Sequence, residues 1–237
     1  MNDLVFLDTE TTGINLFSDY LFQVAYSYKG KLVSEYFKPP LPISIKAQSI
    51  THITNKVVSR KAAFKNSKMR QSLNEILKDN ILVAHNAPFD IYMLSKEGVE
   101  TSQFICTLKV ARFLDQSGEI PEYNLQFLRY YFELNINASA HSAEGDVLVL
   151  EALFKELLSQ MLKKCKNKAE ALDKMIQVSK EPFVFRKFPF GKYRGRSIEE
   201  VAKLDRKYLE WLLEQKTQNP LEEEDWIFTL KKNLKKD

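Results

Sequence analysis

Four acidic side chains stand where strands or helices would carry carboxylates out of the interior. Asp8 and Glu10 are two residues apart after the apolar run LVFL, so a strand would point both from one face. Asp90 follows a second apolar run, ILVA, near an expected helix start, and Asp146 lies in the first turn of another expected helix. Each acid alone also suits a solvated strand end or a helix dipole. If all four converge, their oxygens would suit Mg²⁺ or Mn²⁺, and the lack of a Cys/His cluster argues against zinc.

Two of the three histidines have the same spacing to one of these acids. His141 precedes Asp146 by five positions in the loop HSAEGD, where it could act as a general base. His85 precedes Asp90 by five positions as well, so the spacing alone leaves two candidates. Because His85 ends an apolar strand, it is better placed for a structural hydrogen bond. His52 has no acid at this spacing and is expected to pack or cap locally.

The composition is that of an ordinary globular protein. The 237 residues are 44% hydrophobic and 28% charged, which excludes a disordered tail. The two cysteines, Cys106 and Cys165, are too few for a disulfide framework, so a reducing compartment is expected. The first apolar run is only four residues long, and no run approaches a membrane span. We expect a cytoplasmic protein with no membrane partner.

The positive charge lies towards the C-terminus. The net charge is +4, with 15 basic and 17 acidic residues up to position 154, and 20 basic and 14 acidic residues after it. A basic C-terminal part is compatible with a polyanion partner, but basic faces are often only solvated.

The hydrophobic pattern predicts the strands and helices that must position the acids. Short strands are expected at 3–7, 81–84 and 104–107, and 20–28 and 31–37 form a hairpin pair. Asn86 can cap a helix with Pro88 in its first turn, and a long helix begins at about Ser142. A strand-rich start followed by alternating strands and helices predicts an α/β domain with a mixed sheet flanked by helices.

The C-terminal part has a different character. Residues 163–181 predict a basic helical connector, and 182–237 predict a small α+β module. A two-stranded ribbon is expected there, with Gly191 and Gly195 at its bends. Ser197 and Glu200 form a capping box that opens the next helix.

In combination, the motifs resemble a known family. DTETTG, HNAPFD and H-x₄-D occur in the order found in the DEDDh group of 3′–5′ exonucleases, the DnaQ-like branch of the ribonuclease H-like fold. The resemblance covers domain 1–162. It implies that Asp8, Glu10, Asp90 and Asp146 bind two divalent cations, Mg²⁺ or Mn²⁺, with His141 as the base. The tyrosine variant of the family is excluded, because Ser142 stands four residues before the last acid. The segment FPFGKYRGRSIEEVAKLDRKYLEWLL resembles the C-terminal module of exodeoxyribonuclease X-like proteins.

The resemblance implies a metal-dependent 3′–5′ exonuclease on DNA that releases 5′-mononucleotides. Ile14 and Leu16 could contact the last bases or simply pack on the sheet. Further substrate-binding candidates are Thr11, Thr12, Asn86 and Phe89 at the terminal nucleotide, and Lys192, Arg194 and Arg196 on the nucleic-acid backbone. An RNA-trimming exonuclease, a proofreading subunit of a DNA polymerase and a non-catalytic nucleic-acid binder are the alternatives. Protein partners are not indicated.

Overall fold

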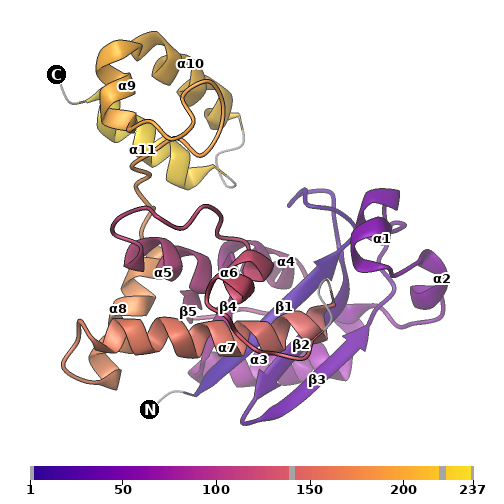
Figure 1. Ribbon diagram of the computed structural model, residues 1–237. Coiled ribbons are helices and arrows are strands. Elements are labelled where there is room, and N and C mark those ends of the chain that lie inside the picture. Colours follow the sequence, from indigo (N-terminus) through magenta and orange to yellow (C-terminus); the bar gives the residue numbers. More distant parts are fainter. Residues whose placement is uncertain (1–2, 139–141, 219–222, 236–237) are drawn as a thin grey trace.

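A twisted five-stranded sheet lies at the centre of the larger part of the molecule. The computed structural model describes residues 3–138, 142–218 and 223–235. The strands are β1 (Leu4–Thr11), β2 (Leu21–Tyr28), β3 (Lys31–Tyr36), β4 (Ile81–Ala84) and β5 (Gln103–Cys106), in the order β3-β2-β1-β4-β5 (Figure 1). β1, β2 and β3 pair antiparallel, whereas β4 is parallel to both β1 and β5. The predicted hairpin and mixed sheet are confirmed.

Helices α3 (Lys68–Asp79) and α4 (Ala87–Lys96) cover one face of the sheet. Leu73 and Leu77 of α3 and Met93 of α4 pack in one core with Val5 and Leu7 of β1. In the sequence, the hairpin is followed by α1 (Ile45–Thr51), α2 (Asn55–Val58) and the 3₁₀ turn η1 (Phe64–Asn66), which precede α3.

The opposite face is covered by a second helical layer. It contains α5 (Thr107–Leu114), α6 (Leu125–Tyr131), α7 (Ala143–Leu162) and α8 (Lys168–Lys180). Leu153 and Phe154 of α7 pack against Ile81 and Val83 of β4. α8 lies within the segment predicted as a connector, and its buried side chains, among them Met175, belong to this same core. Among the helices that the structure describes, none is long and apolar enough to cross a membrane.

The C-terminal part has a core of its own. Helices α9 (Ile198–Leu204), α10 (Arg206–Thr217) and α11 (Glu224–Leu234) pack around a shared apolar cluster that includes Phe188 and Leu230. In Figure 1 this part sits beside α5, at the end of the molecule away from the hairpin. The boundaries 1–162, 163–181 and 182–237 stay a prediction.

The predicted ribbon is wrong in detail. Within the described residues it is reduced to two isolated bridges, Lys187 with Ser197 and Phe188 with Arg194. Pro189 has no N–H for a ladder, and two left-handed glycines turn the chain before strands can extend, Gly191 with φ 70° and Gly195 with φ 82°. The module is therefore helical. Ser197 does cap α9, since its hydroxyl accepts the Glu200 N–H at 3.4 Å.

Candidate active site

Strand β1 delivers Asp8 and Glu10 to the face that α7 covers. Phe6, two residues before Asp8, makes an edge-to-face contact with Phe154 of α7, with ring centroids 5.3 Å apart. Side chains alternate along a strand, so Asp8 and Glu10 point to this same side beyond the apolar contact.

The start of α7 brings Asp146 to these two acids. Ser142 caps the helix by accepting the Gly145 N–H at 3.4 Å, which fixes Asp146 in the first turn. Ala143 and Val147 pack against Ala25 of β2, so small residues let the helix end approach the sheet closely. One carboxylate oxygen each of Asp8, Glu10 and Asp146 lies within 4.8 Å of the others.

Asp90 reaches the site from the other layer. It lies in the first turn of α4 and is only 4% exposed. Its carboxylate accepts the Thr9 hydroxyl at 2.7 Å, which ties α4 to β1 between the two strand acids. Asn86 occupies the N-cap position with φ 64°, but its side chain makes no capping hydrogen bond, contrary to the prediction.

Burial and mutual repulsion make the acids resist ionisation. Burial, then the charges of Asp90, Glu10 and Asp146, raises the pKa of Asp8 well above its usual range. Burial, then the charges of Asp146 and Asp90, raises the pKa of Glu10 to about 7. Burial raises the pKa of Asp90 to about 7 despite the opposing hydrogen bond from Thr9.

These carboxylates fit a divalent cation. Three oxygens from a strand end and a helix start face one point, and no basic side chain is seen paired with Asp8, Glu10 or Asp90 among the described residues. Hard oxygen donors of this kind suit Mg²⁺ or Mn²⁺. A bound cation would offset the repulsion that raises their pKa values.

His85 and His52 both have local structural roles. The Nε2–H of His85 donates to the Tyr123 carbonyl at 2.7 Å, and its Nδ1 lies 2.9 Å from the Thr107 hydroxyl. Burial lowers the pKa of His85 to about 4. The predicted structural role of His85 is confirmed, and His52 terminates α1 in a left-handed conformation. His141 lies outside the described residues.

The loop after β1 uses several hydroxyl groups for its own structure. The Thr11 hydroxyl donates to the Gly13 carbonyl at 2.6 Å, and the Thr12 hydroxyl donates to Asp19 at 2.7 Å. Ile14 is 76% exposed, whereas Leu16 is 6% exposed and belongs to the core. Contact with a base through Leu16 is therefore excluded in this conformation, and Ile14 is available for it.

Two further substrate candidates are placed near the start of α4. Asn86 is exposed, and Phe89 is half-buried against the core that α3 and α4 share. Phe89 therefore packs at least in part against this core.

The cations of the C-terminal module differ in their pairing. Lys192 forms an ion pair with Asp205 at 2.8 Å, and Asp205 also accepts the Tyr193 hydroxyl. Arg194 and Arg196 are exposed. Asp205 has already neutralised one of the three cations predicted to bind a nucleic-acid backbone.

Two supporting residues were not predicted from the sequence. Thr9 holds Asp90, and Gln126 of α6 donates to Asp146 at 2.5 Å. Thr9 stands between the two strand acids, so the alternation of β1 could have indicated a residue facing the α4 layer. Gln126 lies 20 positions before Asp146 in a separate helix, and nothing local marks it.

Comparisons with known proteins agree with this geometry. The chain is 28% identical to exodeoxyribonuclease 10 of Escherichia coli K12 over 215 residues, covering 87% of this chain and 88% of the relative. It is 29% identical to the DNA polymerase III subunit epsilon of Treponema pallidum, covering 72% of this chain and 85% of the relative. A solved structure of exonuclease X in complex with 5′ overhanging duplex DNA matches with TM-score 0.57 and 25% identity, covering 74% of this chain and 99% of the other.

A second solved structure shares the fold. Exonuclease I of E. coli with a dT13 oligonucleotide matches with TM-score 0.58 and 19% identity, covering 69% of this chain and 42% of the other. The exodeoxyribonuclease X-like C-terminal family matches residues 188–216. The exonuclease family model matches residues 5–154, which contain all four acids, and the chain belongs to this exonuclease family.

Proposed function

We propose that this protein is a metal-dependent 3′–5′ exodeoxyribonuclease that releases 5′-mononucleotides. The observation that carries the proposal is the convergence of Asp8, Glu10 and Asp146 within 4.8 Å, inside a chain that belongs to the exonuclease family. The preference for DNA rests on the similarity to exodeoxyribonuclease 10 and exonuclease X along most of the chain.

The acids divide between two cation positions. Asp8 would contribute to both, Glu10 and Asp146 would hold the cation on the side of the attacking water, and Asp90 would support the other. When bound, two divalent cations would stabilise the attacking and leaving oxygens of an in-line phosphoryl displacement. Thr9 and Gln126 act through Asp90 and Asp146, whose carboxylates they orient by hydrogen bonds.

The remaining roles belong to residues around the acids. His141 accepts the proton of the attacking water, because in the sequence it directly precedes Ser142, the residue that caps α7. The hydroxyls of Thr11 and Thr12 fix the backbone of the turn after β1, and this backbone contacts the terminal nucleotide. Asn86 and Phe89 line the pocket for that nucleotide. Ile14, exposed beside this turn, contacts the last base. Of the three cations predicted on the C-terminal module, Arg194 and Arg196 contact the backbone further from the 3′ end, whereas Lys192 is paired with Asp205.

A second candidate is the proofreading subunit of a DNA polymerase, favoured by the similarity to the Treponema pallidum epsilon subunit. A docking tail for a polymerase would be expected to lack a core of its own. Here the C-terminal part has one, and its α11 contacts α5 of the same chain through Arg112 and Asp225 at 3.1 Å. We therefore rank a self-contained exonuclease first. Co-purification with a polymerase would reverse this order.

The decisive experiment is a nuclease assay on matched DNA and RNA oligomers labelled at the 3′ or 5′ end. With Mg²⁺, we expect a 3′-labelled DNA to release labelled mononucleotide at once, while a 5′-labelled DNA shortens stepwise. EDTA should stop both reactions. Faster cleavage of RNA would identify the RNA-trimming alternative, and loss from the 5′ end would contradict the polarity.

A further inference from the structure

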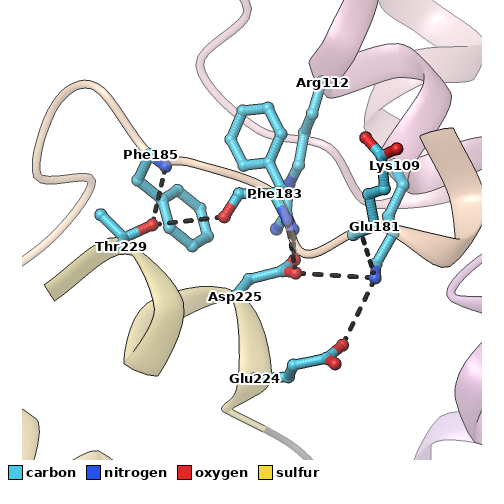
Figure 2. A network of polar contacts seen from close by, with 8 residues as sticks. All are labelled: Lys109, Arg112, Glu181, Phe183, Phe185, Glu224, Asp225 and Thr229. Atoms are coloured by element: carbon cyan, nitrogen blue, oxygen red, sulfur yellow. Dashed lines mark hydrogen bonds and ion pairs between the residues drawn. The ribbon is translucent and has the colours of Figure 1, made fainter. Parts of the chain in front are cut away.

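One acidic side chain docks the C-terminal module on the exonuclease domain. Asp225 of α11 accepts from Arg112 of α5 at 3.1 Å and from the Phe183 N–H at 2.8 Å (Figure 2). Lys109, also on α5 and with a side chain only 8% exposed, lies 3.7 Å from Asp225 and 3.5 Å from Glu224. Asp225, whose side chain is 17% exposed, therefore links α11 to α5 and to the segment that joins the two parts.

A groove of about 1,090 Å³ lies between the two parts. One wall is α5 with the segment 115–123, and the other is the segment 181–189 with Arg194 and Lys232. The groove is open to solvent along one side, so an extended chain could lie in it.

Several charged side chains along the groove are already bonded to other residues of the protein. Lys109 and Arg112 are occupied by the docking contacts, and Arg186 donates to Gln116. Asp115 is already engaged, because it accepts three backbone N–H groups and the Tyr123 hydroxyl.

Three cations remain exposed on the groove wall. Lys187, Arg194 and Lys232 line it, and their side chains have no hydrogen bond or ion pair with any residue the structure describes. The exposed carboxylates of Glu122 and Glu181 also line the groove and, within the described part of the chain, bond only to neutral side-chain amides, so the three cations exceed the unpaired acids by one.

The aromatic rings of the groove are not free to stack on bases. The Arg112 guanidinium lies over Phe185 at 5.0 Å and over Phe183 and Tyr123 at 5.6 Å. Phe185 also stacks on Trp226 with centroids 4.2 Å apart. One face of several of these rings is therefore already covered, and the rest of the lining is largely apolar, so the exposed cations are the groups that would contact the phosphates of a polyanion.

One wall of the groove belongs to a segment that also contacts elements of the candidate active site. Tyr123 lines the groove, and its carbonyl accepts the His85 Nε2–H at the carboxyl end of β4. Two residues further on, α6 begins and carries Gln126, which donates to Asp146. The segment 115–126 thus borders the groove at one end and supports a metal ligand at the other.

We propose that this groove carries the single-stranded part of a nucleic-acid substrate away from the active site, with Lys187, Arg194 and Lys232 on its phosphates. The inference rests on the proposed function, because the strand is the one whose 3′ end lies at the four acids. It moves the backbone contact from Lys192, which Asp205 neutralises, to the cations that face the exonuclease domain.

The test uses the full chain and measures binding in EDTA, independently of cleavage. The groove variant replaces Lys187, Arg194 and Lys232 with Gln, and the matched control replaces Lys203, Lys207 and Lys231, which are exposed on the same module but do not line the groove. Affinity for a 25-nucleotide and a 5-nucleotide single-stranded DNA is measured against salt. Each lost phosphate contact lowers the log–log salt slope by about 0.7 on single strands, so three lost contacts lower it by about 2.

On the long DNA, we expect the salt slope of the groove variant to be lower than that of wild type by about 2. On the short DNA the decrease should be smaller, and the control variant should keep a slope close to that of wild type on both. An unchanged slope in the groove variant, or an equal loss in the control, would overturn the proposal. Failure of the proposed function would show differently, as wild-type protein that binds DNA but leaves its 3′ end intact with Mg²⁺.

Discussion

At the scale of single residues, Asp8 carries an electrostatic cost in the absence of a cation. Its pKa is raised by burial and by three neighbouring acids, so the ionised form destabilises the folded state. We predict that Asp8→Asn abolishes Mg²⁺-dependent cleavage while raising the melting temperature of the metal-free protein at pH 8. Each kcal/mol gained should appear as about 2–4 °C in a thermal melt.

The matched control for this prediction is Asp173→Asn, which removes an exposed acid on α8. It should leave cleavage and the Mg²⁺-induced shift in melting temperature at wild-type values. Asp8→Asn should lose that shift. Retained activity in cleanly purified Asp8→Asn would remove Asp8 from the mechanism.

Kinetic measurements should distinguish His141 from His85, the two histidines that precede a site acid by five positions. We predict that His141→Ala lowers kcat by roughly 10²–10⁴, the usual range for a lost general base. His85→Gln should cost far less at equal folded fraction, since His85 is occupied by the Tyr123 carbonyl and the Thr107 hydroxyl. The measurement is kcat on a saturating oligonucleotide, with folded fraction checked by circular dichroism. A larger loss in His85→Gln would contradict the assignment of the base.

His85 should also leave a signature in stability against pH. Its pKa is about 4 in the folded protein and 6.5 ordinarily, so between these values the unfolded chain binds more protons. Wild type should therefore lose stability relative to His85→Gln as pH falls from about 6.5 to 4, by about 1–3 kcal/mol. Denaturant unfolding of both proteins at several pH values measures this difference, in which the contribution of the acids cancels. A difference that does not vary with pH would show that His85 is not held neutral.

At the scale of elements, prediction succeeded where the apolar pattern is strong and local. β1 and β4 are short apolar strands and α7 is a long apolar helix. Acids near the end of such a strand or in the first turn of such a helix emerge at the sheet edge, so the convergence of Asp8, Glu10 and Asp146 could be predicted. The C-terminal ribbon failed because two left-handed glycines and Pro189 outweigh the β propensity of its aromatics. Asn86 failed as a side-chain cap because it adopts a left-handed conformation.

The loop between β1 and β2 depends on the absence of a single side chain. A Cβ at Gly13 would lie 2.5 Å from the Asp19 carboxylate, which holds the Thr12 hydroxyl at 2.7 Å and the Asn15 N–H at 2.9 Å. We predict that Gly13→Ala destabilises the protein by about 1–3 kcal/mol, as overpacking does. It should also raise KM, because the turn beside Glu10 is displaced.

A double-mutant cycle tests this cause directly. In an Asp19→Ala background the clash is absent, so Gly13→Ala should cost much less than it does in wild type. Equal costs in both backgrounds, measured by denaturant unfolding, would show that Asp19 is not the contact that excludes a side chain at Gly13.

At the scale of the whole molecule, the docking of the C-terminal module could not be predicted from the sequence. The basic character of the C-terminal part was evident, but Lys109 and Asp225 are 116 positions apart and no periodicity links them. The helix dipole favours acids at the start of α11, so nothing in the sequence indicated that one of them contacts another helix. Only the fold shows that Asp225 faces α5 while Glu224 stays 59% exposed.

This pair of neighbouring acids provides the last prediction. Asp225→Ala leaves the Arg112 guanidinium, the buried Lys109 ammonium and the Phe183 N–H without their shared acceptor. Breaking a buried pair costs about 3–5 kcal/mol, whereas losing an exposed one costs about 0–1 kcal/mol. We therefore expect Asp225→Ala to open the segment 181–187 to limited proteolysis and to lower the first unfolding transition, while Glu224→Ala changes little.

Asp225→Asn separates the two parts of this contact. The amide oxygen can still accept the Phe183 N–H, but its neutral group no longer balances Arg112 and Lys109. Protection close to wild type in Asp225→Asn would assign the docking to the backbone hydrogen bond, and protection close to Asp225→Ala would assign it to the ion pair. If Asp225→Ala resists proteolysis as well as Glu224→Ala does, the apolar contacts of Phe183 and Phe185 hold the module without this acid. The groove would then keep its width whatever the charge at position 225, and its cations alone would determine how strongly it binds a strand.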